Sequence, residues 1–190
     1  MARKPAPRPS SPSAPTSWLY QAPQWQLYEV LLSLAWADED ELATMLVARQ
    51  SPRSGKIAAA SFLVDLRCLG VRTAFVRICK SATDYERRLR EPLLAETYMQ
   101  PAELDLVARI LQVGVEYAAT LGFSPDPEYE QARLLLAGAD PAACTVPVVA
   151  GGRHGRPRYR ARPNDPVERI LATLTRTVGA DGFEYVPAKA

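Results

Sequence analysis

Apolar residues between positions 101 and 122 recur at the spacing of an α-helix, on two neighbouring faces. One face carries Leu104, Val107, Leu111, Ala118 and Leu121, and the other carries Leu106, Ile110, Val113 and Tyr117. A surface helix has roughly one 100°-wide apolar face, so this helix should be covered on more than one side. Pro101 is expected in the first turn, and Gly122 is expected to end the helix in the left-handed conformation, with Phe123 folded back onto the last turn.

Gly114 lies in the middle of this predicted helix. A glycine inside a helix costs about 1 kcal/mol relative to alanine. We therefore expect another element to cross the helix closely at this position, where a side chain would not fit.

A second helical pattern precedes the first strands. Within residues 24–33, Leu27, Val30 and Leu31 lie at helical spacing, which predicts an N-terminal helix. Three apolar runs then follow at residues 42–49, 57–67 and 71–79, separated by short polar connections. Short connections between strands favour antiparallel pairing, so these runs predict a three-stranded meander.

The segments around the central helix carry their own boundary signals. Thr83 and Glu86 form a capping box for a helix that Pro92 should kink or end. Asp126 and the proline after it predict a short helix that ends near Gly138.

The C-terminal part is predicted to contain a β-hairpin, a helix and a last strand. Residues 146–150 and 157–162 are the two arms of the hairpin, joined by a glycine-rich turn. Asp165 is expected to cap a helix whose apolar face is Val167, Ile170, Leu171, Leu174 and Val178. Residues 183–186 then form a short strand. The predicted fold class is α+β: an antiparallel β-meander packed with a mostly buried central helix, plus a C-terminal β-hairpin, helix and strand.

Composition divides the chain into a tail and one domain. Residues 1–17 contain five prolines among serines, alanines and basic residues, and such a segment is expected to be disordered. Residues 18–190 are long enough to form a single globular domain with a substantial core. The tail cations Arg3, Lys4 and Arg8 exceed the net charge of +2 of the whole chain, so the domain itself is close to neutral. It is therefore not a general polyanion binder, and any nucleic-acid contact needs a local patch.

The same composition narrows the class of protein. No apolar run reaches the roughly 18 residues of a membrane span, and the N-terminus lacks the apolar core of a signal peptide. The cysteines, Cys68, Cys79 and Cys144, are odd in number and widely spaced, as expected for free thiols. These features predict a cytoplasmic protein with no membrane association, no metal site and no cofactor.

Two segments have a distinctive order of residues. Residues 62–71 read FLVDLRCLGV, and residues 114–125 read GVEYAATLGFSP. With the basic segment from Gly152 to Tyr159, they resemble an uncharacterised bacterial protein family with VDxxCLGV, GxEYAxxLGFxP and GxxGxPxY segments. The resemblance covers roughly residues 40–186 and implies no activity. Arg72 and Thr73 stand where members of that family tend to have Lys-Asp, which argues against any activity that depends on that pair.

Three sequence features are candidates for catalysis or for binding of a metal or phosphate. Asp65 and Glu116 could form a metal-binding carboxylate pair, although Asp65 is better explained as the cap of the loop that follows its strand. Cys68 could be a nucleophile, but the lone histidine, His154, lies in a distant segment and no activating group is evident. The glycines of residues 151–155 could hold a phosphate, yet they lack the P-loop pattern and are more simply a flexible turn.

The most distinctive surface feature is a series of arginines near the C-terminus. It consists of Arg153, Arg156, Arg158, Arg160 and Arg162. Alternate residues of a strand point to one face, so the last four should present their guanidinium groups together, exposed to solvent. Such a row suits a phosphate backbone. The equally weighted alternative is a charged edge strand that prevents aggregation, or one paired with acids such as Asp165 and Glu168.

These observations favour a non-catalytic protein over an enzyme. We predict an accessory subunit of a bacterial nucleoprotein assembly that binds RNA or DNA through the five arginines. A protein–protein adaptor or homo-oligomeric subunit, with Trp18, Trp25 and Trp36 as anchors, is the alternative. A carboxylate- or metal-dependent hydrolase or nuclease built on Asp65 and Glu116 is the second alternative.

Overall fold

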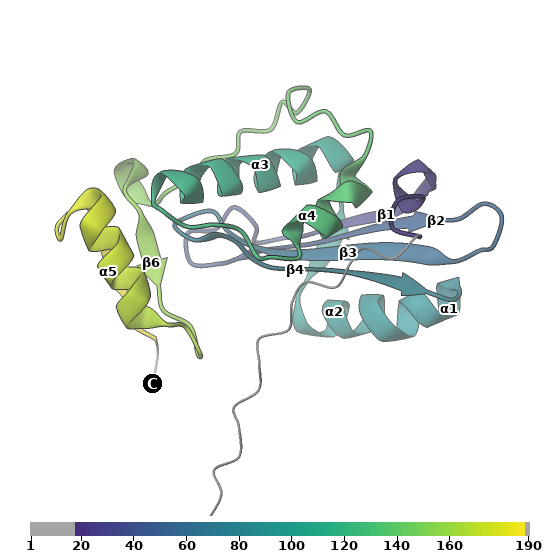
Figure 1. Cartoon of the computed structure of the whole chain (residues 1–190), viewed down its shortest axis with the longest axis horizontal. Coiled ribbons are helices and arrows are strands. Elements are labelled where there is room, and N and C mark those ends of the chain that lie inside the picture. The colour runs from purple at the N-terminus through teal and green to yellow at the C-terminus, as the bar shows by residue number, and fades with distance from the viewer. Residues whose placement is uncertain (1–17, 189–190) are drawn as a thin grey trace, which may run out of the picture.

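The computed structural model describes residues 18–188, which form one main sheet with helices on both faces and a smaller C-terminal unit at one end (Figure 1). The main sheet is antiparallel, with the strand order β4-β3-β2-β1-β5. Its strands are β1 (Gln26–Ser33), β2 (Ala43–Gln50), β3 (Ile57–Asp65), β4 (Gly70–Cys79) and β5 (Met99–Pro101). The α+β fold class and the meander of β2, β3 and β4 are confirmed. The predicted disorder of residues 1–17 lies outside the described residues.

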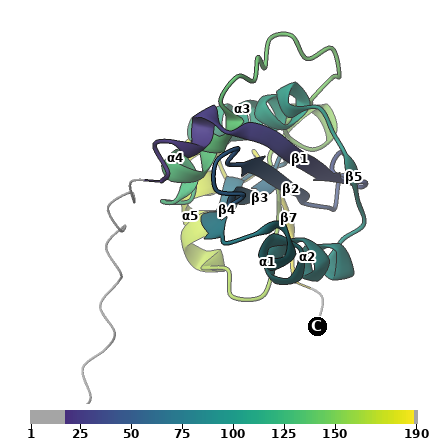
Figure 2. The same cartoon turned by 90° about the vertical axis from the view of Figure 1, so that its right-hand side faces the viewer.

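Different helices cover the two faces of the sheet, as the view along the strands shows (Figure 2). One face carries α3 (Leu104–Thr120), α4 (Tyr129–Ala132) and the 3₁₀ helix η3 (Arg133–Leu136). The other carries α1 (Ala82–Tyr85), the π-helical turn η2 (Glu86–Arg90) and α2 (Glu91–Glu96). Among the helices of residues 18–188, none is long and apolar enough to cross a membrane.

The predicted N-terminal helix over residues 24–33 is wrong, because this segment forms strand β1 between β2 and β5. Val30 and Leu32 pack into the core beneath α3, whereas Leu31 packs into the core on the opposite face. A strand that is buried on both faces is apolar at consecutive positions. It therefore lacks the alternation that distinguishes a strand from a helix.

The neighbouring strands show the same division between two cores. In β2, Met45 and Val47 belong to the core under α3, while Leu46 and Ala48 belong to the core over α1 and α2. The alanines of β3, which are poor strand formers, are fully buried between the two layers. Their position in the sheet is therefore determined by pairing and packing.

The central helix α3 begins three residues later than predicted. Pro101 lies in β5, opposite Leu31, instead of in the first helical turn. The C-terminus follows the prediction, because Gly122 has a φ of 85° and its N–H donates to Ala119. The N–H of Phe123 donates to the carbonyl of Ala118 at 3.0 Å, which completes a Schellman motif.

The helical segment on the other face starts from a different cap. The side chain of Ser81 accepts the N–H of Asp84, so the predicted capping box of Thr83 and Glu86 is wrong. The carboxylate of Asp84, two residues before Glu86, accepts the N–H of Lys80 at 2.9 Å. The chain remains helical through Pro92, and the π-helical turn η2 precedes it.

The short helix after α3 also starts later than predicted. Asp126 accepts the N–H of Glu128 in a turn, and α4 begins at Tyr129 instead of at the proline after Asp126. The helical segment continues through η3 and ends before Gly138, whose φ is 85°.

The C-terminal unit contains β6 (Arg158–Arg160), α5 (Val167–Val178) and β7 (Glu184–Val186). The first arm of the predicted hairpin, residues 146–150, forms no strand, and β6 pairs in parallel with β7. Backbone N–H groups that would pair within such a hairpin instead donate to carbonyls of the loop after β3. The N–H of Arg158 donates to the carbonyl of Arg67 at 3.0 Å, and the N–H of Gly151 donates to Leu66 at 2.9 Å.

The apolar face of α5 packs as expected, but its cap does not. Ile170 and Leu174 are buried in a small core that the C-terminal unit shares with the end of α3. Asp165 makes no cap for α5, and its carboxylate instead pairs with Arg72 of β4 and accepts the hydroxyl of Tyr159 at 3.0 Å. This ion pair and the shared core attach the C-terminal unit to the sheet.

Candidate functional site

The predicted exposure of the arginine row is wrong at its centre. The side chain of Arg158 is 15% exposed, with Nη1 2.9 Å from Glu39 and Nη2 2.9 Å from Asp40. Arg160 is 26% exposed and lies 2.7 Å from the same Asp40 carboxylate oxygen. The acidic loop between β1 and β2 therefore neutralises the two arginines that strand β6 presents together.

The outer members of the row are less enclosed. Arg162 donates to the backbone carbonyl of Asp40 at 3.2 Å, and Arg156 donates to the carbonyl of Asp181. Arg153 is 84% exposed, at 3.9 Å from the Glu39 carboxylate. The side-chain partners of the row come from the β1–β2 loop and from residues 181–184, whereas Asp165, which the alternative named, accepts the backbone N–H of Arg162 at 3.0 Å. Binding of nucleic acid by the arginine row stays a prediction.

Asp65 has the geometry of a loop cap. Its Oδ1 accepts the N–H groups of Arg67 and Cys68, at 2.8 and 3.1 Å, and its Oδ2 accepts the N–H of Leu69 at 3.2 Å. Burial raises the pKa of this carboxyl, and the three N–H groups oppose that shift. The carboxylate is thus occupied by its own turn.

Glu116 has different surroundings from Asp65. It is exposed on α3, where its carboxylate accepts the amide of Gln112 at 2.8 Å. Within residues 18–188 there is no group of three or more His, Cys, Asp or Glu residues that could hold a metal ion. Nothing in the geometry of these two carboxylates joins them into one site.

The structure also shows the surroundings of Cys68, His154 and the glycine-rich turn. Cys68 is fully buried, and burial raises the pKa of its thiol, which disfavours the reactive thiolate. His154 is exposed, with a φ of 59°, in the 3₁₀ turn η4 (Arg153–Gly155). The N–H of Gly152 donates to Arg156 at 2.7 Å, and that of Gly155 donates to Gly152 at 3.1 Å. These backbone groups bind the chain itself and do not form a phosphate cradle.

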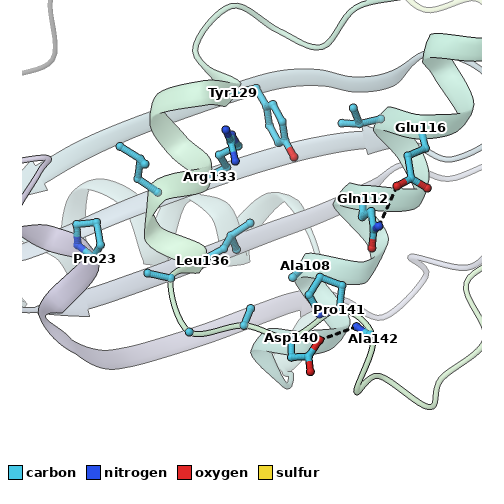
Figure 3. A pocket seen from close by; sticks show the side chains of 15 residues that line it. Pro23, Ala108, Gln112, Glu116, Tyr129, Arg133, Leu136, Asp140, Pro141 and Ala142 are labelled. Carbon is cyan, nitrogen blue, oxygen red and sulfur yellow. Dashed lines mark hydrogen bonds between the residues drawn. The ribbon is translucent and has the colours of Figure 1, made fainter.

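A groove lies between α3 and the segment formed by α4, η3 and the loop after them, with a volume of about 650 Å³ (Figure 3). Its polar groups satisfy one another. Arg133 pairs with Glu130 at 2.7 Å, and the Asp140 carboxylate accepts the N–H of Ala142 at 3.0 Å. Because acids and a base both line the groove, its charge selects neither an anion nor a cation.

A second pocket, of about 700 Å³, lies between η1 (Ala22–Gln24) and the turn that joins β2 to β3. Figure 1 shows η1, in purple, over the same end of the sheet as this turn. The pocket is lined by Trp18, Gln21, Gln24, Trp25, Ser51, Pro52, Arg53, Ser54, Lys56 and Ile78. We call it the tryptophan–arginine pocket. It has two cationic side chains and no acidic one among its lining residues.

The β2–β3 turn presents the two cations on a hydrogen-bonded frame. The N–H of Ser51 donates to the carbonyl of Lys56 at 2.8 Å, and the N–H of Gly55 donates back to Ser51 at 3.0 Å. Gly55 has a φ of 68°, a conformation that glycine adopts without strain. Arg53 and Lys56 are exposed on this frame and form no ion pair with any described residue.

Arg49 holds the opposite wall of the pocket in place. This side chain is buried, and its Nη1 donates to the carbonyl of Trp25 at 2.9 Å. Its Nε donates to the carbonyl of Leu135 at 2.8 Å, and its Nη2 donates to that of Ala137. Burial lowers the pKa of Arg49. These three partners are neutral carbonyls, so the guanidinium adds positive potential behind Trp25.

The two tryptophans are partly buried beside the core, and both also line the pocket. Both pack against the core beneath α3. Neither ring contacts another aromatic ring among the described residues, and neither indole N–H has an acceptor there. The pocket thus combines apolar ring surface with unpaired positive charge.

The sequence indicates the turn and the tryptophans of this pocket separately, but it does not predict that they lie next to each other. The sequence predicts a turn at residues 51–56, and Trp18 and Trp25 are predicted anchors for a protein partner. Their proximity depends on β1 being a strand, because pairing of β1 with β2 brings Gln26 opposite Gln50. The predicted helix over residues 24–33 concealed that relation.

In comparisons with known proteins, no protein-family model, no curated protein and no solved structure matches the chain.

Proposed function

We propose that this chain is a non-catalytic, cytoplasmic accessory protein that binds nucleic acid, and that the tryptophan–arginine pocket is its principal contact. The proposal rests on one observation: two tryptophans and two unpaired cations line a single pocket that has no acidic residue. Proteins that bind nucleic acid commonly combine aromatic side chains, on which bases stack, with a positively charged groove that follows the backbone.

The charge distribution favours this pocket over the arginine row. The central arginines of the row already have carboxylate partners in Glu39 and Asp40. Arg53 and Lys56 have none, and they lie on a fixed turn, so binding a phosphate breaks no existing ion pair. We therefore assign the arginine row a secondary role, through its exposed member Arg153.

The proposal is tested by titrating labelled RNA and DNA oligonucleotides at several salt concentrations. Two phosphate contacts give a slope of log K against log salt of about −1.4 for single strands, at about −0.7 per contact. Replacing both cations, as Arg53→Gln with Lys56→Gln, should remove most of this slope. Both side chains are exposed, so circular dichroism should show an unchanged fold.

A matched control removes the same charge elsewhere. Arg169 and Arg176 are exposed on α5, far along the chain from the pocket, and Arg169→Gln with Arg176→Gln should leave binding nearly unchanged. Equal loss in both double variants would mean that only net charge matters and would contradict the proposed site. If a polyglutamate peptide competes with the labelled oligonucleotide as well as unlabelled nucleic acid does, the pocket's ligand would be an acidic protein partner. The adaptor hypothesis expects this result.

A further inference from the structure

We infer that the tryptophan–arginine pocket takes an unpaired base, so that its ligand is a single strand and not a duplex. This inference rests on the proposed function and specifies the substrate class of the same pocket. It follows from the kind of surface that the pocket offers to a nucleic acid.

Two tryptophans are among the apolar residues that line the pocket, and an indole ring can stack on the flat face of a base. Trp18 and Trp25 come from the two ends of a short segment that contains η1, and both line the pocket. In a duplex, each base face is covered by its neighbours in the stack. A face becomes available only when the base is unpaired and splayed out.

The shape of the pocket fits the same ligand. Its volume of about 700 Å³ lies within the range of about 300–1,000 Å³ that small-molecule sites occupy. A site of this size has room for a single nucleotide. Ser51, which is buried, and Ile78 of β4 extend the lining below the rings.

The polar groups around the rings divide into two sets. Arg53 and Lys56 lie on the β2–β3 turn and are suited to phosphate oxygens. Gln21 and Gln24 lie on the segment of the tryptophans, and both are exposed. A glutamine amide both donates and accepts hydrogen bonds, so it can meet the edge of any base. We expect phosphates toward the turn, the base against the rings, and little preference for base identity.

The experiment compares three ligands of equal length with the full chain. They are a thymidine oligonucleotide, the same backbone with abasic sites, and a blunt duplex. Binding is followed by quenching of tryptophan fluorescence in a Trp36→Phe background, which leaves Trp18 and Trp25 as the only tryptophans. Because base–aromatic stacking contributes about 1–3 kcal/mol per base, the intact single strand should bind at least about fivefold more tightly than the abasic one.

The outcomes separate the inference from the proposed function. Tighter binding of the intact single strand than of both other ligands supports the inference. Equal binding of the abasic strand or of the duplex overturns it but leaves nucleic-acid binding in place. Absence of binding for all three ligands at low salt overturns the proposed function itself. Fluorescence anisotropy of labelled ligands gives a second readout if quenching is weak.

Discussion

Gly70 and Gly114 lie against each other where α3 crosses the start of β4. A Cβ atom built on Gly70 would lie 2.8 Å from the carbonyl oxygen of Gly114 and 2.7 Å from the Cβ of Ala118. A Cβ atom built on Gly114 would lie 2.8 Å from Cγ1 of Val64. The two glycines therefore set the distance between helix and sheet, as the position of Gly114 in the sequence had predicted.

Substituting Gly114 by leucine should destabilise the protein by about 1–3 kcal/mol, because the added side chain overpacks a close crossing. Urea unfolding followed by circular dichroism measures this change. Ala119→Leu is the matched control, since Ala119 is exposed on the same helix and should lose little stability. A Gly114→Leu variant as stable as the wild type would mean that the crossing relaxes freely.

The same crossing shows how far sequence patterns predict this fold. Local signals were sufficient to predict α3 and the meander. These signals are the helical period of α3, the glycine that ends it, and the apolar runs of β2, β3 and β4. The identity of β1 was not predictable, because its second half, residues 30–33, is buried on both faces and consecutive apolar residues fit a helix equally well. Parallel pairing of β6 with β7 joins segments more than twenty residues apart and leaves no local signal.

The candidate site was even harder to predict from the sequence, because it depends on contacts between residues that are far apart along the chain. Residue types alone favoured the arginine row, since charge partners cannot be read from a strand pattern. Glu39 and Asp40 reach Arg158 across more than a hundred residues of sequence. Arg53 and Lys56, in contrast, stand out only after the ion pairs of the other basic residues are known.

Replacing Arg158 and Arg160 together with alanine should destabilise the fold, contrary to what their predicted exposure implied. The substitution removes three contacts to the acidic loop, so that Glu39 and Asp40 lose the arginines that lie within 3 Å of their carboxylates. Since the pairs are partly exposed, we expect a loss of about 1–3 kcal/mol, between the values for surface and buried pairs.

Thermal unfolding at low and high salt checks this prediction. The difference between the double alanine variant and the wild type should shrink at high salt, because salt screens the interaction it removes. Adding Glu39→Gln and Asp40→Asn to the double variant should restore part of the stability, because it removes two negative charges that have lost their contacts with Arg158 and Arg160. Unchanged stability of the double alanine variant would show that the loop is held by other contacts.

Tyr117 should make stability fall at alkaline pH. Burial raises the pKa of this phenol to about 12, above its ordinary value near 10, and its hydroxyl donates to the carbonyl of Gly155 at 3.1 Å. A raised folded-state pKa favours the protonated phenol in the native state. Its contribution is therefore complete below about pH 10 and is lost as the pH rises toward 12.

The Tyr117→Phe variant isolates this effect, because phenylalanine cannot ionise. Urea midpoints measured between about pH 10 and pH 12 should fall less steeply in the variant than in the wild type. Burial also raises the pKa of Tyr85 and of Tyr159, so the variant should retain some alkaline sensitivity. If the urea midpoint falls equally steeply with pH in the two proteins, ionisation of Tyr117 does not contribute to the loss of stability.

Arg49 should be required both for stability and for the shape of the tryptophan–arginine pocket. Its guanidinium binds the carbonyls of Trp25, Leu135 and Ala137, which belong to two separate segments of the chain, the end of η1 and the end of η3. Arg49→Met keeps the apolar stem but leaves these carbonyls without their charged donor. Hydrogen bonds to charged groups contribute about 1.5–3 kcal/mol each, and removing the cost of a buried charge offsets part of that loss. We expect a net destabilisation of about 2–4 kcal/mol.

Arg49→Lys separates charge from geometry in the same position. A lysine keeps the positive charge but lacks the planar fork that reaches several carbonyls at once, so it should restore only part of the stability. In a Trp36→Phe background, the fluorescence of Trp25 and Trp18 reports whether the pocket wall has moved. If Arg49→Met matched the wild type in both stability and fluorescence, the carbonyls would have other donors, and Trp25 would be held by its packing against the core alone.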